Sequence, residues 1–260
     1  MRLDDLSAPP IASLPFEPEA CLFDLDGTLV DSEPLFEYSE ELLLGSWGMT
    51  VDDELRREIF GRSAVSFFEI VERRFPANAI NLTPLSERLA AKTKFFLETA
   101  HGRIATFPPI EKLARSLAVA GIPLAIASSS NHEIIDFELD ETGLSGLFPV
   151  RVSAVDVAKG KPEPDVFLEA ARRLGAEPHR CVVFEDSVFG LIAARAAGAF
   201  AISLPAPGAE LARFSSADLL LPGGPALANA ARLLDFLAIG PSRGRLSEGR
   251  QLSTPTTPSE

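Results

Sequence analysis

Short, almost continuous apolar runs recur along this chain at strand length. They lack the alternation of polar and apolar residues that a half-exposed strand shows, so we expect strands that are covered on both faces. The runs are ACLFD (20–24), IPLAIA (122–127), PVRVS (149–153), RCVVFE (180–185), FAISL (200–204) and DLLLP (218–222). Because helix-length patterns separate the later runs, the chain is predicted to form an α/β fold on a doubly wound parallel sheet.

These helix-length patterns cover Ile110–Ala120, Asn131–Asp140, Pro164–Leu174, Ser187–Ala197 and Ala226–Ala238. In the first of them, Leu113, Leu117 and Ala120 recur at helical spacing, which places them on one helix face. A glycine follows several of the patterns at the position where helices commonly end. The pattern therefore predicts helices that pack on the sheet between successive strands.

The stretch from residue 33 to residue 104 has a different pattern. It contains four helical patterns in succession and no convincing strand. Inserted after the first strand of an α/β sheet, such a block lies over the carboxyl ends of the strands, where these sheets bind ligands. We therefore expect a helical lid at 33–104 on a core formed by residues 19–32 and 105–239. The four patterns cover Leu35–Leu44, Asp53–Phe60, Ala64–Phe75 and Leu85–Ala100.

The two ends of the chain differ in composition from the core. Residues 1–18 form a proline-rich arm, and residues 240–260 are rich in Ser, Thr, Pro and Gly without periodicity. Such a tail buries too little apolar surface to fold, so we expect it to be disordered. The N-terminus is acidic and broken by prolines, and no 18 apolar residues are continuous. We therefore expect neither a signal peptide nor a membrane span.

Composition and charge narrow the class of protein. Hydrophobic residues make up 46% and charged residues 23% of the chain, as in ordinary globular proteins and unlike fibrous or disordered ones. A net charge of −13 argues against a nucleic acid or an anionic membrane as partner. Cys21 and Cys181 each lie in an apolar run, so we expect buried thiols in a cytoplasmic protein. The sequence shows no obvious exposed apolar stripe that could form an interface between subunits, so we expect a monomer.

Two carboxylates end the first apolar run, in the sequence FDLDGTLVDSEP. Asp24 closes the expected strand and Asp26 follows two residues later, with Gly27 turning the chain. Acids this close repel one another, and a bound divalent cation removes the repulsion. The alternative is an ordinary strand-end turn in which Asp26 or Thr28 caps the next segment.

A hydroxyl group and a lysine follow later strands. The second run ends in AIASSSNHEII, which places Ser128 at a strand terminus and Asn131 near a helix start. That arrangement can hold a phosphate, although simple N-capping explains the same residues. Lys161 lies in AKGKPEPDVF, between prolines that stiffen the segment. A lysine so held can be aimed at an anion, but it can also be an ordinary surface charge.

Glu185 and Asp186 end the fourth run, directly before a helix of small residues. Adjacent carboxylates supply the hard oxygen ligands that suit Mg²⁺, and they also complement the positive end of a helix. Each of the four polar segments thus has a purely structural explanation. Together they indicate one site, because all of them lie at carboxyl ends of strands in the same parallel sheet.

The order of acid pair, hydroxyl, lysine and acid pair resembles that of the haloacid dehalogenase superfamily. The resemblance covers about residues 19 to 222 and rests on the DLDGT, SSS, GKPEPD and FEDS segments. The helical insertion is similar to the small helical cap of the β-phosphoglucomutase-like branch, also called CbbY-like. The resemblance implies a Rossmann-like core with an inserted helical cap, and phosphoryl transfer from a small phosphorylated metabolite with Mg²⁺ as cofactor.

The resemblance also implies a role for each matching residue. Asp24 would attack phosphorus and form an aspartyl phosphate, and Asp26 would act first as general acid and then as general base. Ser128 and Lys161 would bind the oxygens of the transferring phosphoryl group. Further residues expected near the phosphate or the rest of the substrate are Ser129, Asn131 and Arg62.

The same resemblance implies the metal ligands. Mg²⁺ would be held by Asp24, by the backbone carbonyl of Asp26 and by Asp186, with Glu185 in or beside the coordination shell. One Mg²⁺ and one ammonium group would then neutralise charge around an anionic nucleophile, which is most of what phosphoryl transfer requires from a protein.

Three functions fit this scaffold. Asp26 favours cleavage of a phosphate ester, because haloacid dehalogenases and phosphonoacetaldehyde hydrolases lack an acid at that position. β-Phosphoglucomutases carry a His ten residues after the second Asp, where this chain has Phe36, and an Arg three residues after a cap Gly, where Gly61 is followed by Ala64. These differences favour a phosphatase acting on a sugar or polyol phosphate. A phosphosugar mutase and a non-catalytic phosphate-binding domain remain as alternatives.

A few residues of the lid carry further expectations. Arg62 is expected on a cap loop, where it either contacts substrate or is an ordinary surface residue. Lys92 and Lys94 fall on the polar face of a lid helix and are expected to be solvated. Ser32 lies at the hinge between core and lid, where it can line the site.

Overall fold

The structure is a computed structural model that describes residues 13–59 and 62–239 of the chain. Within those residues, six parallel strands form one sheet in the order β3-β2-β1-β4-β5-β6. The strands are β1 (Ala20–Phe23), β2 (Leu124–Ser128), β3 (Val150–Ser153), β4 (Cys181–Glu185), β5 (Phe200–Ser203) and β6 (Leu219–Leu220). Each predicted apolar run contains most or all of one strand, and the strand order confirms the predicted doubly wound fold.

The central strands are buried along their whole length, which explains their continuous apolar sequences. Every residue of β1, β2 and β4 is buried. Leu22 in β1 is in register with Ala125 on one side and with Val183 on the other. Because helices cover both faces, successive side chains meet apolar neighbours whichever way they point.

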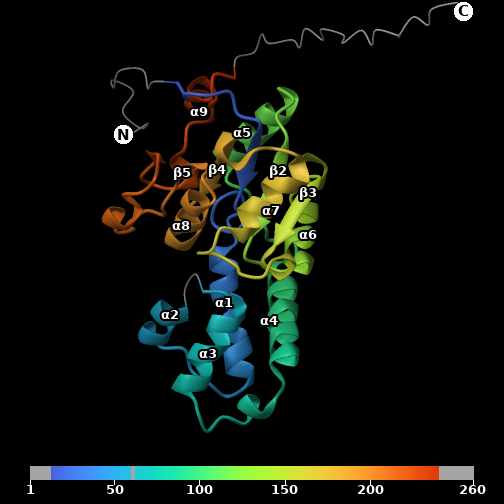
Figure 1. Cartoon of the computed structure of the whole chain (residues 1–260). Coiled ribbons are helices and arrows are strands. Elements are labelled where there is room, and N and C mark those ends of the chain that lie inside the picture. Colours follow the sequence, from blue (N-terminus) through green and yellow to red (C-terminus); the bar gives the residue numbers. More distant parts are fainter. Residues whose placement is uncertain (1–12, 60–61, 240–260) are drawn as a thin grey trace, which may run out of the picture.

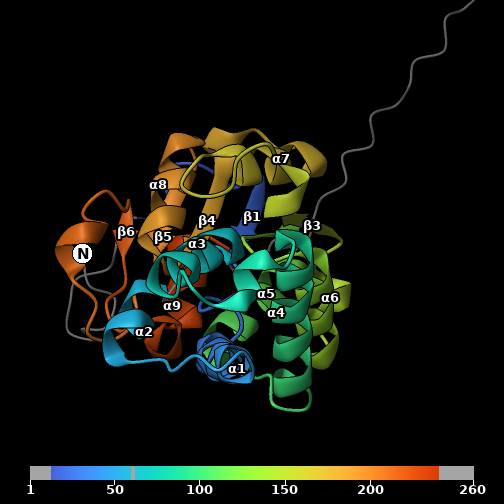
Figure 2. The same cartoon turned by 90° about the horizontal axis from the view of Figure 1, so that it is seen from below.

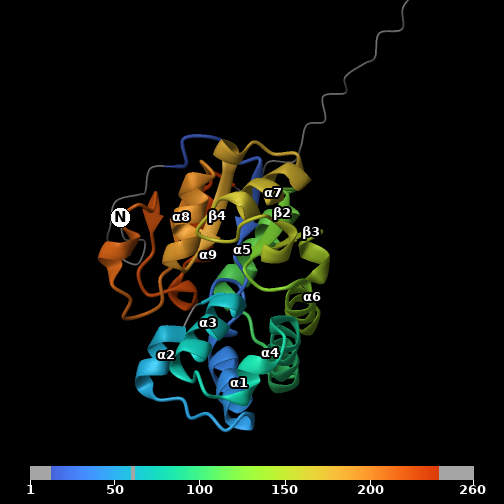
Figure 3. The same cartoon turned by 60° about the horizontal axis from the view of Figure 1, so that its bottom comes forward.

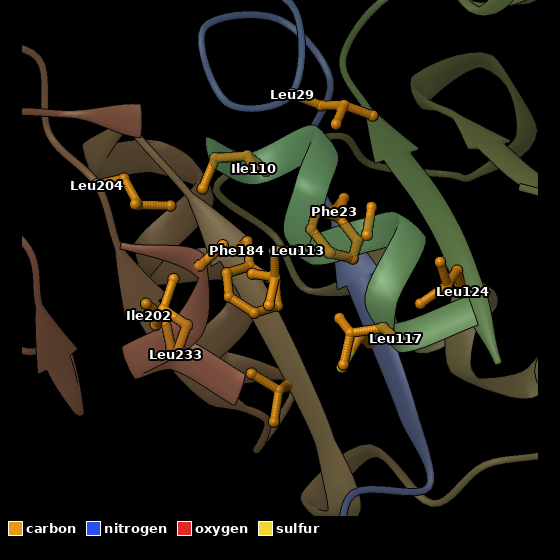
Figure 4. Close-up of a cluster of buried hydrophobic side chains, with 14 of the residues drawn as sticks. Phe23, Leu29, Ile110, Leu113, Leu117, Leu124, Phe184, Ile202, Leu204 and Leu233 are labelled. Atoms are coloured by element: carbon orange, nitrogen blue, oxygen red, sulfur yellow. The ribbon is translucent and has the colours of Figure 1, made fainter. Parts of the chain in front are cut away.

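Helices cover the two faces of the sheet (Figure 2). One face packs against α5 (Pro108–Val119), α6 (His132–Glu141) and α9 (Ala230–Phe236), and the other against α7 (Asp165–Leu174) and α8 (Val188–Ala196). Figure 4 shows part of the first of these cores, where Phe23 and Phe184 of the sheet lie near Leu113 and Leu117 of α5. The rings of Phe23 and Phe184 stack with their centroids 4.6 Å apart.

Four further helices form the cap, which lies beyond one end of the sheet (Figures 1 and 3). They are α1 (Glu33–Ser46), α2 (Asp53–Ile59), α3 (Ala64–Arg74) and α4 (Leu85–Ala100). The cap has its own hydrophobic cluster, which includes Leu43, Phe67 and Phe68 and contains no residue of the sheet. These helices correspond to the predicted helical insertion after the first strand.

The structure differs from the prediction near the C-terminal end of the core. The sequence pattern predicts one helix over Ala226–Ala238, but the chain forms a short 3₁₀ turn at Pro225–Leu227 and begins α9 only at Ala230. The Asn229 side chain accepts a hydrogen bond from the backbone N–H of Arg232 and so caps the second helix. The predicted disordered tail at 240–260 and Gly61 lie outside the described residues.

Both cysteines are buried, as their place in apolar runs predicts. Cys21 and Cys181 are buried and unpaired. Burial raises the pKa of the Cys181 thiol to about 12, so this thiol stays protonated at neutral pH. Across 13–59 and 62–239, no helix combines the length and the apolar character that crossing a membrane would require.

Candidate active site

The predicted site residues come together at the carboxyl ends of β1, β2 and β4. A cavity of about 630 Å³ lies there, between the edge of the sheet and the cap. Its lining includes Asp24, Asp26, Ser129, Asn131, Lys161, Glu185, Asp186 and Arg62. Segments that are far apart in sequence therefore meet in one crevice, as the parallel topology requires.

Lys161 is the charged centre of this crevice. It comes from the loop between β3 and α7, and its Nζ forms ion pairs with Asp24 Oδ1 and with Glu185 Oε1, the latter at 2.7 Å. The ammonium also lies 5.0 Å from the centroid of the Phe167 ring. Burial opposes the charge of Lys161, but Asp24 and Glu185 outweigh it and hold its pKa above the usual value. Lys161 is therefore a permanent cation at the base of the cavity.

Three carboxylates surround this lysine closely enough to share a cation. Asp24, Glu185 and Asp186 each offer an oxygen within 4.8 Å of the others. Both oxygens of Glu185 already have partners, Lys161 and the backbone N–H of Ser187. Asp186 Oδ1 accepts a hydrogen bond from the Thr28 hydroxyl at 2.9 Å. Within the described part of the chain, one oxygen of Asp24 and one of Asp186 accept no hydrogen bond and can face a ligand.

The three carboxylates of Asp24, Glu185 and Asp186 can carry more negative charge than Lys161 alone neutralises, which favours a second cation at this point. Burial raises the pKa of Asp186 well above its usual range, and the charges of Glu185 and Glu33 raise it further. A divalent metal reverses that effect by stabilising the ionised form. Gly27 keeps its backbone close to the trio, because a Cβ there would lie 2.6 Å from Asp186 Oδ2. Carboxylate oxygens with a backbone close by fit Mg²⁺, which prefers oxygen ligands.

Hydroxyl groups surround Asp26. Ser32 donates to Asp26 Oδ1 at 2.7 Å, and Ser130 donates to Oδ2 at 2.7 Å. The hydroxyl of Ser128 lies 3.3 Å from the same Oδ2 and accepts a hydrogen bond from the backbone N–H of Ser130. Ser128 therefore points toward Asp26 in this structure, while Ser129 and Ser130 line the cavity. Ser130 belongs to the SSS motif, but the motif alone does not show that its hydroxyl contacts Asp26.

Asn131 joins the core to the cap. Its Oδ1 accepts a hydrogen bond from the backbone N–H of Ile134 and so caps α6. Its Nδ2 donates to the hydroxyl of Thr93 on α4 at 2.7 Å. Both N-capping and a place at the cavity were expected for this residue, and the structure shows both.

The prediction that Lys92 is solvated is wrong. Lys92 is only 9% exposed and forms an ion pair with Glu40 at 2.7 Å. Its ammonium lies 5.1 Å from the ring centroids of both Phe36 and Phe67. The partners come from α1 and α3, so the period of α4 alone could not reveal them. Lys94, by contrast, is exposed as expected.

Arg62 lies on the cap side of the cavity, as expected for a cap loop. Its side chain is exposed, and its Nε donates to the carbonyl of Glu58 at 3.2 Å. The guanidinium carbon lies 5.8 Å from the ring centroid of Phe189, which belongs to α8 of the core. Arg62 therefore reaches from the cap toward the core at the cavity wall.

Two acids with raised pKa values, the half-buried Glu33 and the buried Glu138, were not identified from the sequence. Burial raises the pKa of Glu33 to about 8, with Asp26 and Glu40 adding to the shift. Burial also raises the pKa of Glu138 well above its usual range, and Asp26 raises it further. The sequence signal for Glu138 is an acid on the apolar face of the predicted helix over 131–140.

Comparisons with known proteins agree with this geometry. Residues 18–198 match the profile of the haloacid dehalogenase-like hydrolases. Hexitol phosphatase B of Escherichia coli K12 is 32% identical, over 80% of this chain and 94% of its own. A probable pseudouridine-5'-phosphatase of Drosophila melanogaster is 31% identical, over 77% of this chain and 87% of its own.

A solved structure extends the comparison to the fold. The crystal structure of CbbY from Rhodobacter sphaeroides in complex with phosphate superimposes with a TM-score of 0.72 and 31% identity, covering 83% of this chain and 99% of that one. The family profile spans more than half of the chain, and the relatives are similar across both the core and the cap. The chain belongs to the haloacid dehalogenase-like hydrolase family.

Proposed function

We propose that this protein is a Mg²⁺-dependent phosphatase that hydrolyses a small sugar or polyol phosphate through an aspartyl-phosphate intermediate. The observation that carries the proposal is the arrangement around Lys161. Its ammonium lies between Asp24 and Glu185 while one oxygen of Asp24 and one of Asp186 remain open to the cavity. A nucleophilic carboxylate beside a fixed cation is what transfer of a dianionic group needs.

The first half of the reaction uses Asp24 and Asp26. The free oxygen of Asp24 forms a bond to phosphorus while the bond from phosphorus to the ester oxygen breaks. Asp26 gives a proton to that oxygen, so the leaving group departs as an alcohol. Lys161 stays charged throughout and binds phosphoryl oxygens, together with polar groups of Ser129, Ser130 or Asn131 at the cavity wall.

The second half releases the phosphate. Water attacks phosphorus of the aspartyl phosphate, and Asp26, now ionised, takes a proton from it. The bond from phosphorus to Asp24 breaks, which regenerates the carboxylate and leaves inorganic phosphate. Closure of the cap over the cavity would exclude bulk water while the aspartyl phosphate forms, and one water would be readmitted for this step.

The metal site follows from the same residues. Asp24, Asp186 and the backbone carbonyl of Asp26 would hold Mg²⁺, and Glu185 would fix Lys161 because both of its oxygens already have partners in the protein. When bound, the ion supplies positive charge that stabilises the transferring phosphoryl group.

The cap residue Phe36 supports a phosphatase over a mutase. Phe36 lines the cavity and stacks on Phe96 of α4 with ring centroids 3.9 Å apart. A phenyl ring can neither carry a proton nor hydrogen-bond to a sugar hydroxyl, as a histidine at this position can. The names of the hexitol and pseudouridine relatives support a substrate whose leaving group carries several hydroxyls.

The test is a panel of phosphate esters assayed for released phosphate, with Mg²⁺ and with EDTA. We expect hydrolysis of sugar or polyol phosphates that EDTA abolishes. Asp24→Asn should fall below about one-thousandth of wild-type turnover, as nucleophile variants commonly do. The matched control is Asp31→Asn, an exposed aspartate in the same loop, which should stay active.

Three outcomes would contradict the proposal. Turnover of p-nitrophenyl phosphate by Asp24→Asn would exclude Asp24 as the nucleophile. Conversion of β-glucose 1-phosphate to glucose 6-phosphate instead of free phosphate would establish the mutase. Absence of Mg²⁺-stimulated hydrolysis across the whole panel would support a non-catalytic phosphate-binding domain.

A further inference from the structure

The cap places an ion pair in the wall of the cavity. The pair consists of Glu40 of α1 and Lys92 of α4, two helices that pack together in the cap (Figure 1). Both residues line the cavity, and Lys92 Nζ lies 2.7 Å from Glu40 Oε1. The side chain of Lys92 is 11% exposed and that of Glu40 is 12% exposed. Two opposite charges therefore meet at the cavity wall with most of their surface removed from water.

Stability alone does not explain an ion pair in this place. Taking two charges out of water costs about as much as their attraction returns, so apolar side chains of similar size are often equally stable. The ammonium of Lys92 also lies 5.1 Å from the ring centroids of Phe36 and Phe67, which are surroundings that suit an apolar side chain. Burial raises the pKa of Glu40, and the charge of Lys92 opposes that rise. The place of the pair in the cavity wall offers the explanation.

The pair has hydrogen-bonding capacity beyond its own contact. An ammonium group carries three N–H donors, and a carboxylate offers several lone pairs. The contact between Lys92 and Glu40 uses only part of this capacity. A donor beside an acceptor matches two neighbouring hydroxyl groups of a sugar or polyol, because each hydroxyl can both donate and accept.

The same pair disfavours a second anionic group on the substrate. Glu40 neutralises the charge of Lys92, and Glu37, three residues earlier on α1, adds another carboxylate to the cavity wall. Among the described cap cations of this wall, Arg56 is also paired with a carboxylate, and Arg62 is exposed. A second anion in the cap half of the cavity would thus lose hydration without meeting a buried, unpaired cation.

We propose that the ion pair between Glu40 and Lys92 determines which leaving group the cavity takes. It hydrogen-bonds to neighbouring hydroxyls of an uncharged sugar or polyol and, because Glu40 neutralises Lys92, it disfavours a substrate with a second phosphate. This inference rests on the proposed function, since it concerns the leaving group of the phosphate ester. The pair takes no part in the transfer of the phosphoryl group.

The first test changes the charge of the pair and keeps its shape. Glu40→Gln leaves Lys92 as a cation that an anionic substrate group can pair with. The substrates are fructose 1-phosphate and fructose 1,6-bisphosphate, which differ by one phosphate group. We expect wild type to have the higher kcat/KM on the monophosphate. In Glu40→Gln the ratio should shift toward the bisphosphate by about tenfold or more, the value of a hydrogen bond to a charged group.

The matched control is Glu69→Gln, which changes the net charge equally. Glu69 is exposed on α3 of the cap and does not line the cavity. Because water and salt screen a charge at such a position, the ratio should stay within about twofold of wild type. Arg62 is present in all of these proteins, so its effect on the ratio cancels.

A second variant keeps the test valid if Glu40→Gln does not fold. Glu40→Leu combined with Lys92→Met replaces the ion pair by an apolar pair, a change that proteins often tolerate without loss of stability. p-Nitrophenyl phosphate has no hydroxyl on its leaving group and so reports the chemistry alone. We expect kcat/KM to fall about tenfold on fructose 1-phosphate and less than about threefold on p-nitrophenyl phosphate, since only the sugar loses its hydrogen bonds.

Three results would overturn the inference. They are a wild type that prefers the bisphosphate, a Glu40→Gln protein with the wild-type ratio, and equal losses of the double variant on the two esters. A wild type that turns over no sugar or polyol phosphate would instead overturn the proposed function, before any variant is compared.

Discussion

The ammonium group of Lys161 has two carboxylate partners at once. The side chain of Lys161 is 5% exposed, and those of its partners Asp24 and Glu185 are 9% and 1% exposed. A buried ion pair gains little over an apolar pair, but removal of one partner leaves an uncompensated charge. The stability of the core and the proposed chemistry of the site therefore depend on the same three side chains.

Lys161→Met is expected to lose both activity and stability. Without the cation, Asp24 and Glu185 face each other uncompensated, which costs about 3–5 kcal/mol in comparable cases. Turnover of p-nitrophenyl phosphate should fall by about 10²–10³, the typical effect of removing one charged or donor group from a transferring centre. The measurements are phosphate release and urea unfolding in EDTA.

The control for that variant is Lys159→Met. Lys159 lies two residues before Lys161 in the same loop and is exposed. Its replacement should therefore change neither the turnover of p-nitrophenyl phosphate nor the urea unfolding midpoint. A Lys161→Met protein with the wild-type unfolding midpoint would show that the ion pairs with Asp24 and Glu185 do not form in solution.

At the scale of the elements, helix α8 begins directly against the site. Ser187 caps this helix, and its hydroxyl accepts a hydrogen bond from the backbone N–H of Gly190. The missing side chain of Gly190 leaves room for Glu185, because a Cβ at Gly190 would lie 1.6 Å from Glu185 Oε1. Glycine at this point of the helix thus lets Glu185 reach Lys161.

Two helical glycines allow a direct comparison. Gly190→Ala should lower the free energy of unfolding by about 1–3 kcal/mol, because the added methyl group overpacks a buried site. Gly45→Ala in α1 has open space, since no described atom beyond its own helix backbone and chain neighbours lies within 4 Å of the added Cβ. It should raise the free energy of unfolding by about 0.5–1 kcal/mol, the gain in helix propensity.

Urea unfolding curves of the two variants check this prediction, and activity adds a second readout. Gly190→Ala displaces Glu185 from Lys161 and should lose activity, whereas Gly45→Ala should retain it. If Gly190→Ala were as stable and as active as wild type, the close approach of Glu185 to the α8 backbone would not exist in solution.

At the scale of the whole molecule, α6 of the core lies against α4 of the cap. Among the residues that the structure describes, few polar contacts join these two helices. One is the hydrogen bond from Asn131 to Thr93. Beside it, Phe96 and Phe137 pack edge to face with centroids 6.5 Å apart. The cavity lies between these two parts of the molecule, so the contacts that hold the cap also shape the site.

A double-mutant cycle on Asn131→Ala and Thr93→Val measures this coupling. Thr93→Val keeps the shape of the side chain and removes the acceptor, whereas Asn131→Ala also removes the cap of α6, which is worth about 1 kcal/mol. The coupling free energy from urea unfolding should be about 0.5–1.5 kcal/mol, the net value of one hydrogen bond. Strictly additive effects would mean that the core and the cap are not joined by this bond.

Most of the fold was predictable because its signals are local. Residues 181–185 are apolar enough to mark a buried strand, and they form β4. The helix predicted over 226–238 was wrong because the apolar period continues across Asn229, whose side chain starts a new helix. The acid pairs and Lys161 were predictable because strands that run parallel end at the same edge.

Other features of the site depend on contacts between elements. Lys92 looks solvated on α4 alone, and only the packing of α1 and α3 supplies Glu40 and the two phenyl rings that bury it.

The sequence by itself determined the doubly wound sheet, the helical insertion after the first strand, and the set of acids and lysine at the carboxyl ends, because periodicity and strand polarity are properties of the local chain. Only the tertiary structure decided which oxygen of each acid is occupied and which lysine is buried in the cap. Those properties depend on distances between side chains of different elements, and such distances are fixed when the elements pack.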